Sequence, residues 1–235
     1  MIDLYASTTP NVLKVTLMLE ECGLDYRMLP VNVWKGEQFA PDFLALNPNA
    51  KVPVIVDHDG PTTVFESVAI LFYLAEKCGC LLPASGAPRA AVMQWLVFQA
   101  ANLGPTNGQF NHFKLFAPPD QAYGRDRYTT ELHRIYAVME QRLTQTSYLG
   151  GEAFSIADLA VFPWVWSNAN RWAETLSFLA PAASPGIAAW YEHCKARPAV
   201  QRGLAAHGTL KPLVSTSTPD DLDRMFGRGA YAWRS

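Results

Sequence analysis

Residues 47–67 read NPNAKVPVIVDHDGPTTVFES and show the clearest structural pattern in the chain. The β-branched, apolar run at residues 52–56 predicts a buried strand. Turn composition at residues 58–60 and a second run at 62–65 predict another strand directly after it. Glu66-Ser67 then opens a strongly apolar segment that predicts a helix. This order of strand, turn, strand and helix is typical of one half of a small mixed sheet with helical cover.

The residues before this stretch predict the other half of the sheet. Residues 2–5 predict a short strand, and Pro10 stands where proline favours entry into a helix, which the apolar spacing then continues. Residues 26–33 predict a second strand, and residues 35–48 are loop-like with room for one helical turn. Two strand-helix units around one mixed sheet predict an α/β thioredoxin-like domain over residues 1–82.

The rest of the chain predicts helices and no convincing strand. Residues 83–88 are rich in proline, alanine and glycine and predict a linker. A capping-box pattern at Ser155 marks the start of a strong helix. We therefore expect an all-helical domain over residues 89–208 and a C-terminal tail over 209–235 in which residues 220–226 form an amphipathic turn or two. The helices expected in the second domain cover 89–103, 123–144, 155–172 and 186–197.

Charge and composition exclude several classes of function. The chain has 235 residues, with 19 basic against 21 acidic side chains, so it lacks the basic surface that nucleic-acid binding requires. It shows no signal peptide and no apolar run long enough to span a membrane, which predicts a cytoplasmic protein with no membrane partner. Aromatic residues are abundant, with 7 Trp, 9 Tyr and 12 Phe in a chain that is only 17% charged. This surplus predicts a large interface, a pocket, or both.

The motifs of nucleotide, metal and serine-hydrolase chemistry are absent. The histidines are scattered and the cysteines match no zinc spacing, so no metal is expected. A thioredoxin-like fold places its redox motif at the start of the first helix, where this chain has Thr8-Thr9-Pro10-Asn11 and no cysteine. Cys78-Gly79-Cys80 falls at a helix C-terminus, where the helix dipole raises a thiol pKa. Thiol chemistry in this protein therefore requires a thiol that arrives with a ligand.

Three loops are expected to meet at one edge of the predicted sheet. Thr9 and Asn11 lie at a helix N-terminus, where backbone N–H groups favour an anion such as a thiolate. The alternative is that Thr9 only caps the helix. Lys51-Val52-Pro53 suggests a cis-proline turn that leaves the Val52 backbone able to pair with an extended peptide. The alternative is an edge proline without a ligand.

The third loop is Phe65-Glu66-Ser67. Ser67 can offer its N–H and hydroxyl to a carboxylate at the positive end of the next helix, and Glu66 can accept an ammonium group. The alternative is again helix capping, because glutamate is favoured in a first turn anyway. Taken together, the three loops suit a peptide with a free amino-acid end, an extended amide and a thiol. Glutathione has that form.

These motifs recur with others in a known pattern. The runs that carry it are Met1-Ile2-Asp3-Leu4-Tyr5, Thr9-Pro10-Asn11, Lys35-Gly36-Glu37-Gln38-Phe39, residues 47–53, Phe65-Glu66-Ser67 with Ala69-Ile70, Gly108-Gln109, His112-Phe113, Arg127-Tyr128 with Glu131, and Ser155-Ile156-Ala157-Asp158. With them the chain resembles the cytosolic glutathione transferases, and among these the bacterial Nu class of disulfide-bond oxidoreductases. The resemblance runs nearly end to end and is weakest in the predicted tail.

The resemblance implies a site for one or two glutathione molecules, or for the disulfide, and no metal. It assigns Thr9 and Asn11 to the sulfur as catalytic residues, Val52 and Pro53 to the peptide backbone, Gln38 and Lys51 to the glycine end or the peptide, Glu66 and Ser67 to the γ-glutamyl end, and Arg127 to a second glutathione. Tyr5 is an alternative sulfur ligand, because other classes use a tyrosine of the first strand. A second pocket between the domains is expected at Trp34, Phe110, His112 and Phe113, with Phe116 and Trp164 as further candidates. For Trp164 the alternative is ordinary helix core.

The function that the resemblance implies is glutathione-dependent disulfide reduction by a homodimer. Bound glutathione thiolate attacks a disulfide, and the same thiolate supports transferase or peroxidase side activity on a small electrophile. An isomerase or dehalogenase variant would differ only in the second pocket. The alternative from another class is a glutathione-binding regulatory or stress protein with little catalysis.

Overall fold

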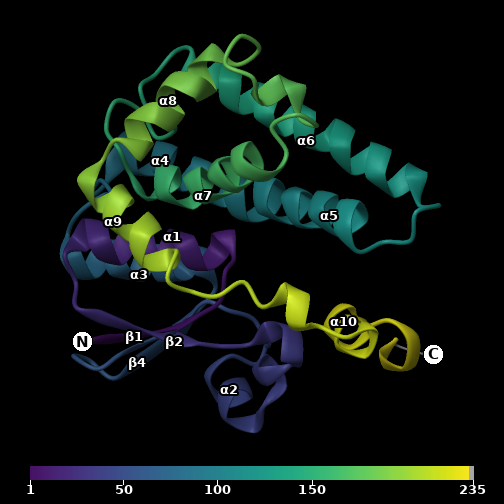
Figure 1. Ribbon diagram of the computed structural model, residues 1–235. Helices are drawn as coiled ribbons and strands as arrows, with labels where there is room; N and C mark the ends of the chain where they lie inside the picture. The colour runs from purple at the N-terminus through teal and green to yellow at the C-terminus, as the bar shows by residue number, and fades with distance from the viewer. Residues whose placement is uncertain (233–235) are drawn as a thin grey trace. The chain divides into compact units, whose positions relative to one another are not determined.

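The strand-turn-strand pattern of residues 47–67 forms half of a four-stranded mixed sheet (Figure 1). Its strands are β1 (Ile2–Ala6), β2 (Tyr26–Pro30), β3 (Val54–Asp57) and β4 (Thr62–Phe65), in the order β2-β1-β3-β4. β1 runs parallel to β2 and antiparallel to β3, and β3 pairs antiparallel with β4. The predicted thioredoxin-like sheet is therefore confirmed, although β2 is shorter than the predicted strand over 26–33.

Two helices cover one face of this sheet, and a third lies on the other side (Figure 1). α1 (Pro10–Cys22) has proline at its first position and ends at Gly23, whose φ of 63° is the left-handed conformation that glycine adopts freely. α3 (Ser67–Cys78) follows β4 directly. Between β2 and β3 the chain forms two 3₁₀ turns and then the short helix α2, at η1 (Val33–Lys35), η2 (Glu37–Phe39) and α2 (Pro41–Leu46).

The described residues 1–232 divide into two compact units in this computed structural model. The first unit is Met1–Leu74 together with the chain from Arg202 on, and the second is Ala75–Gln201. The second unit therefore begins within α3, ahead of the boundary expected at residue 82. The segment predicted as a separate tail over 209–235 groups with the first unit instead.

The second unit is helical, as predicted. Its helices are α4 (Gly86–Phe98), the π-helical η3 (Gln99–Leu103), α5 (Gly104–Leu115), α6 (Ala122–Leu143), α7 (Ile156–Arg171) and α8 (Pro185–Lys195), with the 3₁₀ turn η4 (Ser177–Leu179) before α8; α9 (Pro198–His207) continues into the first unit. The predicted linker over 83–88 is partly wrong, because α4 already begins at Gly86 after the N-cap Ser85. α5 and α9 were not among the predicted helices.

A buried carboxylate organises the core of the second unit. The predicted capping box is confirmed: the Ser155 N–H donates to Asp158 Oδ2 at 2.9 Å, and the Ser155 hydroxyl caps the helix in return. Asp158 also accepts from Trp190 Nε1 at 2.9 Å and from the Leu149 N–H at 3.0 Å. Burial raises the pKa of Asp158, and these donors oppose that rise.

No helix within residues 1–232 is long and apolar enough to cross a membrane.

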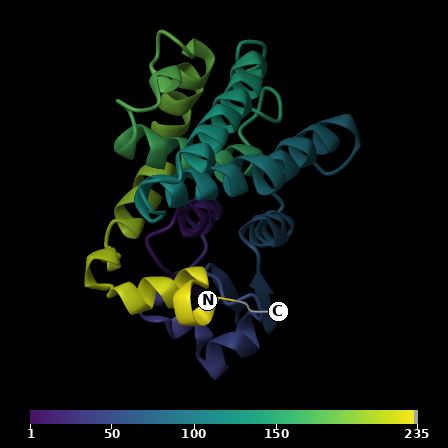
Figure 2. The same ribbon diagram turned by 90° about the vertical axis from the view of Figure 1, so that its right-hand side faces the viewer.

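The chain beyond α9 folds onto the first unit (Figure 2). It forms the 3₁₀ turn η5 (Val214–Thr216), the helix α10 (Pro219–Phe226) and the 3₁₀ turn η6 (Gly229–Tyr231). α10 packs beside η1, with Lys35 Nζ 2.5 Å from Asp221 Oδ2 and the Arg224 guanidinium 5.3 Å from the centre of the Phe39 ring. The predicted amphipathic turn over 220–226 is thus a docked helix.

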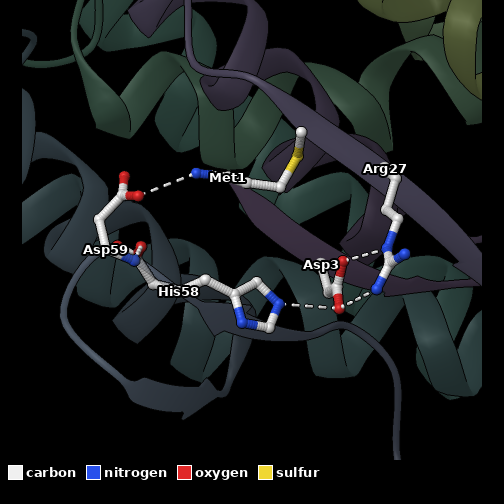
Figure 3. A network of polar contacts seen from close by, with 6 residues as sticks. Met1, Asp3, Arg27, His58 and Asp59 are labelled. Atoms are coloured by element: carbon white, nitrogen blue, oxygen red, sulfur yellow. Dashed lines mark hydrogen bonds and ion pairs between the residues drawn. The ribbon is translucent and has the colours of Figure 1, made fainter.

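A polar network closes the end of the sheet where β1 begins (Figure 3). The Asp3 carboxylate, which is 5% exposed, accepts from Arg27 on β2 at 2.5 and 2.9 Å and lies 3.0 Å from His58 Nε2. The N-terminal ammonium of Met1 pairs with Asp59 at 3.1 Å. The hydrogen bonds from Arg27 lower the pKa of Asp3 to about 2, with His58 contributing in the same direction.

Candidate functional site

The N-terminus of α1 carries the first of the predicted site residues. Thr9 is the N-cap, and its hydroxyl oxygen accepts from the Val12 N–H at 3.2 Å, so the capping role is present in the structure. A hydroxyl keeps one proton to donate while it accepts, and a cap therefore does not exclude a second partner. Asn11 is half-buried on the first turn, where no acidic side chain competes for the helix N-terminus.

The second loop has the predicted cis peptide bond between Val52 and Pro53. The pairing of β3 begins only at Val54, so Val52 lies outside the sheet ladder. The Asn47 side chain fixes this loop through two hydrogen bonds to its backbone. Its amide nitrogen donates to the Lys51 carbonyl at 2.7 Å, and its oxygen accepts from the Asn49 N–H at 2.9 Å. Asn47 is 1% exposed, and it is not among the predicted site residues.

The third loop is held in an unusual backbone conformation. Glu66 has a φ of 68°, in the left-handed region that residues with a Cβ rarely adopt. Its carbonyl accepts the first helical hydrogen bond of α3, from the Ile70 N–H at 2.9 Å, and its carboxylate accepts from Asn49 Nδ2 at 3.1 Å. Such strain is maintained by the surrounding structure and is concentrated at functional sites. Ser67 follows as the first residue of α3 and is 8% exposed.

A buried cation lies behind this loop. Lys14 on α1 is 1% exposed, and its Nζ donates to Ser67 Oγ at 3.2 Å. Burial lowers the pKa of Lys14 to about 7, while the charge of Glu66 acts in the opposite direction. Lys14 is not a predicted site residue, because a lysine between the apolar Leu13 and Val15 gives no sign in the sequence of which way it faces.

The three loops enclose one small cavity of about 50 Å³. It brings together the helix N-termini of α1 and α3, a cation and a carboxylate at the rim, and a backbone strand edge. An anion-binding helix end beside a carboxylate suits a zwitterionic amino-acid group, and a free strand edge suits an extended peptide. The residues that line the cavity are Asn11, Asn47, Lys51, Val52, Pro53, Glu66 and Ser67.

Thr9 is not among the residues that line this cavity, and three further predicted residues lie elsewhere. Gln38 on η2 is 4% exposed and does not line the cavity; its Oε1 has no hydrogen-bond partner among residues 1–232. Arg127 belongs to the second unit, where it is exposed on α6 and its guanidinium lies 3.4 Å from Glu131. Tyr5, the alternative sulfur ligand, packs its ring edge-on against Phe43 of α2 at 6.0 Å.

The residues predicted for a second pocket belong to different units. Trp34 lies in the first unit, where it packs against a hydrophobic cluster of Val31, Val33, Phe43 and Val54, whereas the other predicted residues belong to the second. Phe110 is fully buried and packs against Trp172 at 5.5 Å. The expectation that Phe110 lines a pocket is therefore corrected: it is core, because its face of α5 points into the helical unit.

The remaining aromatic candidates are also packed within the second unit. His112 lies 5.8 Å from the Phe113 ring, measured between centroids, and Phe113 stacks on Tyr128 at 5.4 Å. His112 also lies 6.3 Å from Phe116. Trp164 on α7 is 7% exposed, in agreement with the core alternative.

The cysteines stand apart from the cavity. None of the four is in a disulfide, and Cys194 is buried while the others are half-buried. Cys78 and Cys80 flank Gly79 at the C-terminal end of α3, away from the helix end that would stabilise a thiolate. Among the residues that the structure describes, no three His, Cys, Asp or Glu side chains cluster as a metal site.

Comparison with known proteins agrees with this geometry. Residues 8–77 match the family model "Glutathione S-transferase, N-terminal domain", and residues 122–193 match "Glutathione S-transferase, C-terminal domain". The chain is 47% identical over 209 residues to the disulfide-bond oxidoreductase YfcG of Escherichia coli (strain K12), an alignment that covers 87% of this chain and 94% of that protein.

Two solved structures extend the comparison. A glutathione transferase from Burkholderia graminis, with two glutathione molecules bound per subunit, superposes with a TM-score of 0.81 at 41% identity, covering 87% of this chain and 88% of the other. A glutathione transferase from Pseudomonas putida, with one glutathione disulfide bound per subunit, gives a TM-score of 0.80 at 38% identity, covering 86% and 90%.

Proposed function

The chain belongs to the glutathione S-transferase family, and from this premise we propose that it is a glutathione-dependent disulfide-bond reductase. The observation that carries the proposal is the single cavity in which Asn11, Val52 and Ser67 meet. Each of these offers a different group: an amide at a helix N-terminus, a backbone edge, and a hydroxyl at a second helix N-terminus. The names of its relatives, a disulfide-bond oxidoreductase and transferases with bound glutathione or its disulfide, support the same activity.

In the proposed complex, glutathione lies along the cavity. Its γ-glutamyl end meets Glu66 and Ser67, with the ammonium on the carboxylate and the carboxylate on the start of α3. Its cysteinyl backbone pairs with Val52 as an added strand beside the Pro53 turn. Lys51 faces the glycine carboxylate, and Gln38 remains a proposed contact to the same end of the peptide.

The sulfur of this glutathione faces Thr9 and Asn11. The hydroxyl and amide protons and the N-terminus of α1 stabilise the thiolate, so the thiol proton leaves to solvent. The thiolate attacks one sulfur of the disulfide substrate, which forms a mixed disulfide and expels the other half as a thiolate that takes a proton from water. A second glutathione thiolate then attacks the mixed disulfide, which releases the second substrate thiol and glutathione disulfide.

Several finer points belong to this proposal. Arg127 on α6 contacts the second glutathione, and the aromatic side chains Trp34, His112 and Phe113 contact the disulfide or electrophile. The activated thiolate also gives transferase and peroxidase side activity. No protein cysteine takes part, since the reacting thiols all belong to glutathione and the substrate.

Asn11→Ala tests the proposal directly. We expect kcat/KM for glutathione-dependent reduction of a small disulfide to fall roughly 100-fold, as when one preorganised donor is removed from a developing anion. The matched control is Asn170→Ala on an exposed turn of α7. This variant should reduce the disulfide at the wild-type rate. A variant with serine at Cys22, Cys78 and Cys80 should also remain active. Full activity in Asn11→Ala contradicts the proposal, and tight glutathione binding by an inactive wild type favours the regulatory alternative.

We also propose that the chain forms a homodimer. Val97 on α4 is 54% exposed and Phe65 at the end of β4 is 38% exposed, and we propose that a partner subunit covers these apolar side chains. Light scattering coupled to size-exclusion chromatography should give twice the 26.0 kDa mass of the chain. A mass of one chain at micromolar concentration contradicts this part of the proposal.

A further inference from the structure

The interior of the first unit holds a charged side chain that the proposed chemistry does not use. Lys14 is 1% exposed on α1, and it is one of the largest fully buried side chains in the described chain. Lysine is almost never fully buried unless it is paired, because removing an ammonium group from water is costly. Replacing a buried charged group with an apolar side chain of similar volume is often neutral or stabilising, so stability alone does not account for a lysine at this position.

The hydrogen bond of Lys14 fixes the polarity of its partner. An ammonium group has only donors, so Ser67 Oγ must accept the bond from Lys14 Nζ at 3.2 Å. The one proton on that hydroxyl therefore points elsewhere, and Ser67 lines the cavity. Ser67 also begins α3, so the carbonyl four residues earlier that a mid-helix serine uses as an acceptor is outside the helix. Lys14 thus sets Ser67 to donate toward the ligand.

The charge of Lys14 acts in the same direction. Its ammonium lies behind the N-terminus of α3, where the helix already carries partial positive charge. Glu66, at the rim, acts on this ammonium with a charge of opposite sign, and the burial of Lys14 keeps its charge poorly screened by solvent. A bound carboxylate at Ser67 would face a hydroxyl proton, a helix N-terminus and this buried cation together.

We propose that Lys14 is a positioning residue for the γ-glutamyl carboxylate of glutathione, acting through the Ser67 hydroxyl and through its buried charge. This inference rests on the proposed function, because it assigns a role within the same site. It makes two separable statements: the hydroxyl orientation needs a donor at residue 14, and the charge contribution needs a cation there.

The charge contribution is linked to pH. Burial lowers the pKa of Lys14 to about 7, and a carboxylate bound nearby favours the protonated form. Binding of the anion therefore takes up a proton in the range just above pH 7, so affinity falls as the pH rises through that range. The same measurement on Lys14→Met, which keeps Glu66 and the ligand but lacks the lysine, isolates the contribution of Lys14.

Binding of S-methylglutathione, measured by calorimetry, tests the proposal without any thiol chemistry. At pH 6.5 we expect Lys14→Met to raise the Kd roughly tenfold, the size of a lost hydrogen bond to a charged group. Lys14→Gln keeps a donor but has no charge, so its Kd should lie between those of the wild type and Lys14→Met. We expect the Kd of the wild type to change several-fold between about pH 6.5 and 8.5, and this change should be absent in Lys14→Gln. Lys211→Met, at an exposed lysine, is the matched control and should bind like the wild type.

A modified ligand shows whether the effect acts through the γ-glutamyl carboxylate. The S-methyl analogue in which 4-aminobutyrate replaces the γ-glutamyl residue lacks only that carboxylate. The Kd values of the wild type and Lys14→Met for this analogue should agree within about twofold. Without the carboxylate, Lys14 has no group to act on, so its substitution has no further effect in the double-mutant cycle. In turnover, the substitution should raise KM for glutathione much more than it lowers kcat.

The outcomes separate the two proposals. If the wild type fails to bind S-methylglutathione, the proposed function fails. If the wild type binds and Lys14→Met binds equally well, or if the variant weakens both ligands to the same extent, the role of Lys14 fails alone. Thermal unfolding of the variants guards against misfolding; Lys14→Met should unfold at or above the wild-type temperature, because a buried charge has been replaced by an apolar side chain.

Discussion

The polar groups at the two ends of the sheet in the first unit have different partners. Where β1 begins, the Asp3 carboxylate is enclosed by Arg27 and His58, and the polar groups satisfy one another (Figure 3). Where β1 ends, around Asn11 and Ser67, the helix N-termini and a strand edge face a cavity. The first arrangement stabilises the fold, and the second is the one that we propose binds glutathione. Similar residue types therefore serve stability or binding according to whether their partners come from the chain itself.

Asp3→Asn gives the largest expected effect on stability in this comparison. We expect the free energy of unfolding at pH 7 to fall by about 1–2 kcal/mol, discounted because Arg27 is largely exposed. The pKa of Asp3 is lowered on folding, so its contribution is present above the ordinary carboxyl pKa of about 3.9 and is lost as the pH falls toward about 2.

Urea unfolding of both proteins from pH 7 down to acid pH measures this contribution. The two curves of stability against pH should converge toward pH 2, while glutathione turnover at pH 7 stays within about twofold of the wild type. Asn11→Ala should show the reverse pattern, with turnover lost and stability kept. An Asp3→Asn protein that is as stable as the wild type but inactive would contradict the assignment of stability to one end of the sheet and binding to the other.

A smaller effect is expected at Glu66, where the ligand end carries strain. Because φ is 68° there, Glu66→Gly should be about 1 kcal/mol more stable than Glu66→Ala, which keeps the strained Cβ. Both variants lose the carboxylate, so both should bind S-methylglutathione about tenfold more weakly than the wild type. Chemical denaturation and calorimetry on the matched pair measure the two quantities. Equal stability of the pair indicates that the backbone at residue 66 is not under strain.

Much of the first unit follows from local sequence. The β-branched run before Asp57, the proline at the start of α1 and the glycine at its end each act through their immediate neighbours, and the corresponding elements form where they are predicted. The cis peptide before Pro53 follows from the same local logic. The cavity is lined by residues at the ends of these local elements, among them Asn11, Val52 and Ser67.

Other features depend on contacts between distant segments. Lys14 is buried because α3 packs over α1 and brings Ser67 to it, a contact 53 residues away. α5 contains Gly104, Pro105 and Gly108, which have low helix propensity, and the π-helical turn before it leads directly into the helix. Phe110 could have faced a pocket or the core, and only the packing against Trp172 decides between these. Such choices are made by tertiary structure and leave no local pattern.

The contact of α10 with Lys35 and Phe39 has a consequence for biosynthesis. The first unit is discontinuous in sequence: its sheet lies within residues 2–65, and its last packing elements, from Arg202 on, follow the second unit. At a typical rate of about 5–20 residues per second, the ribosome needs on the order of ten seconds to make the second unit in between. During that interval the nascent sheet and α1 lack two packing partners. These are Gly203, which packs against Leu17, and the helix α10. The helical unit can therefore be complete first, and the packing of the first unit is completed only after the residues from Arg202 on have been made.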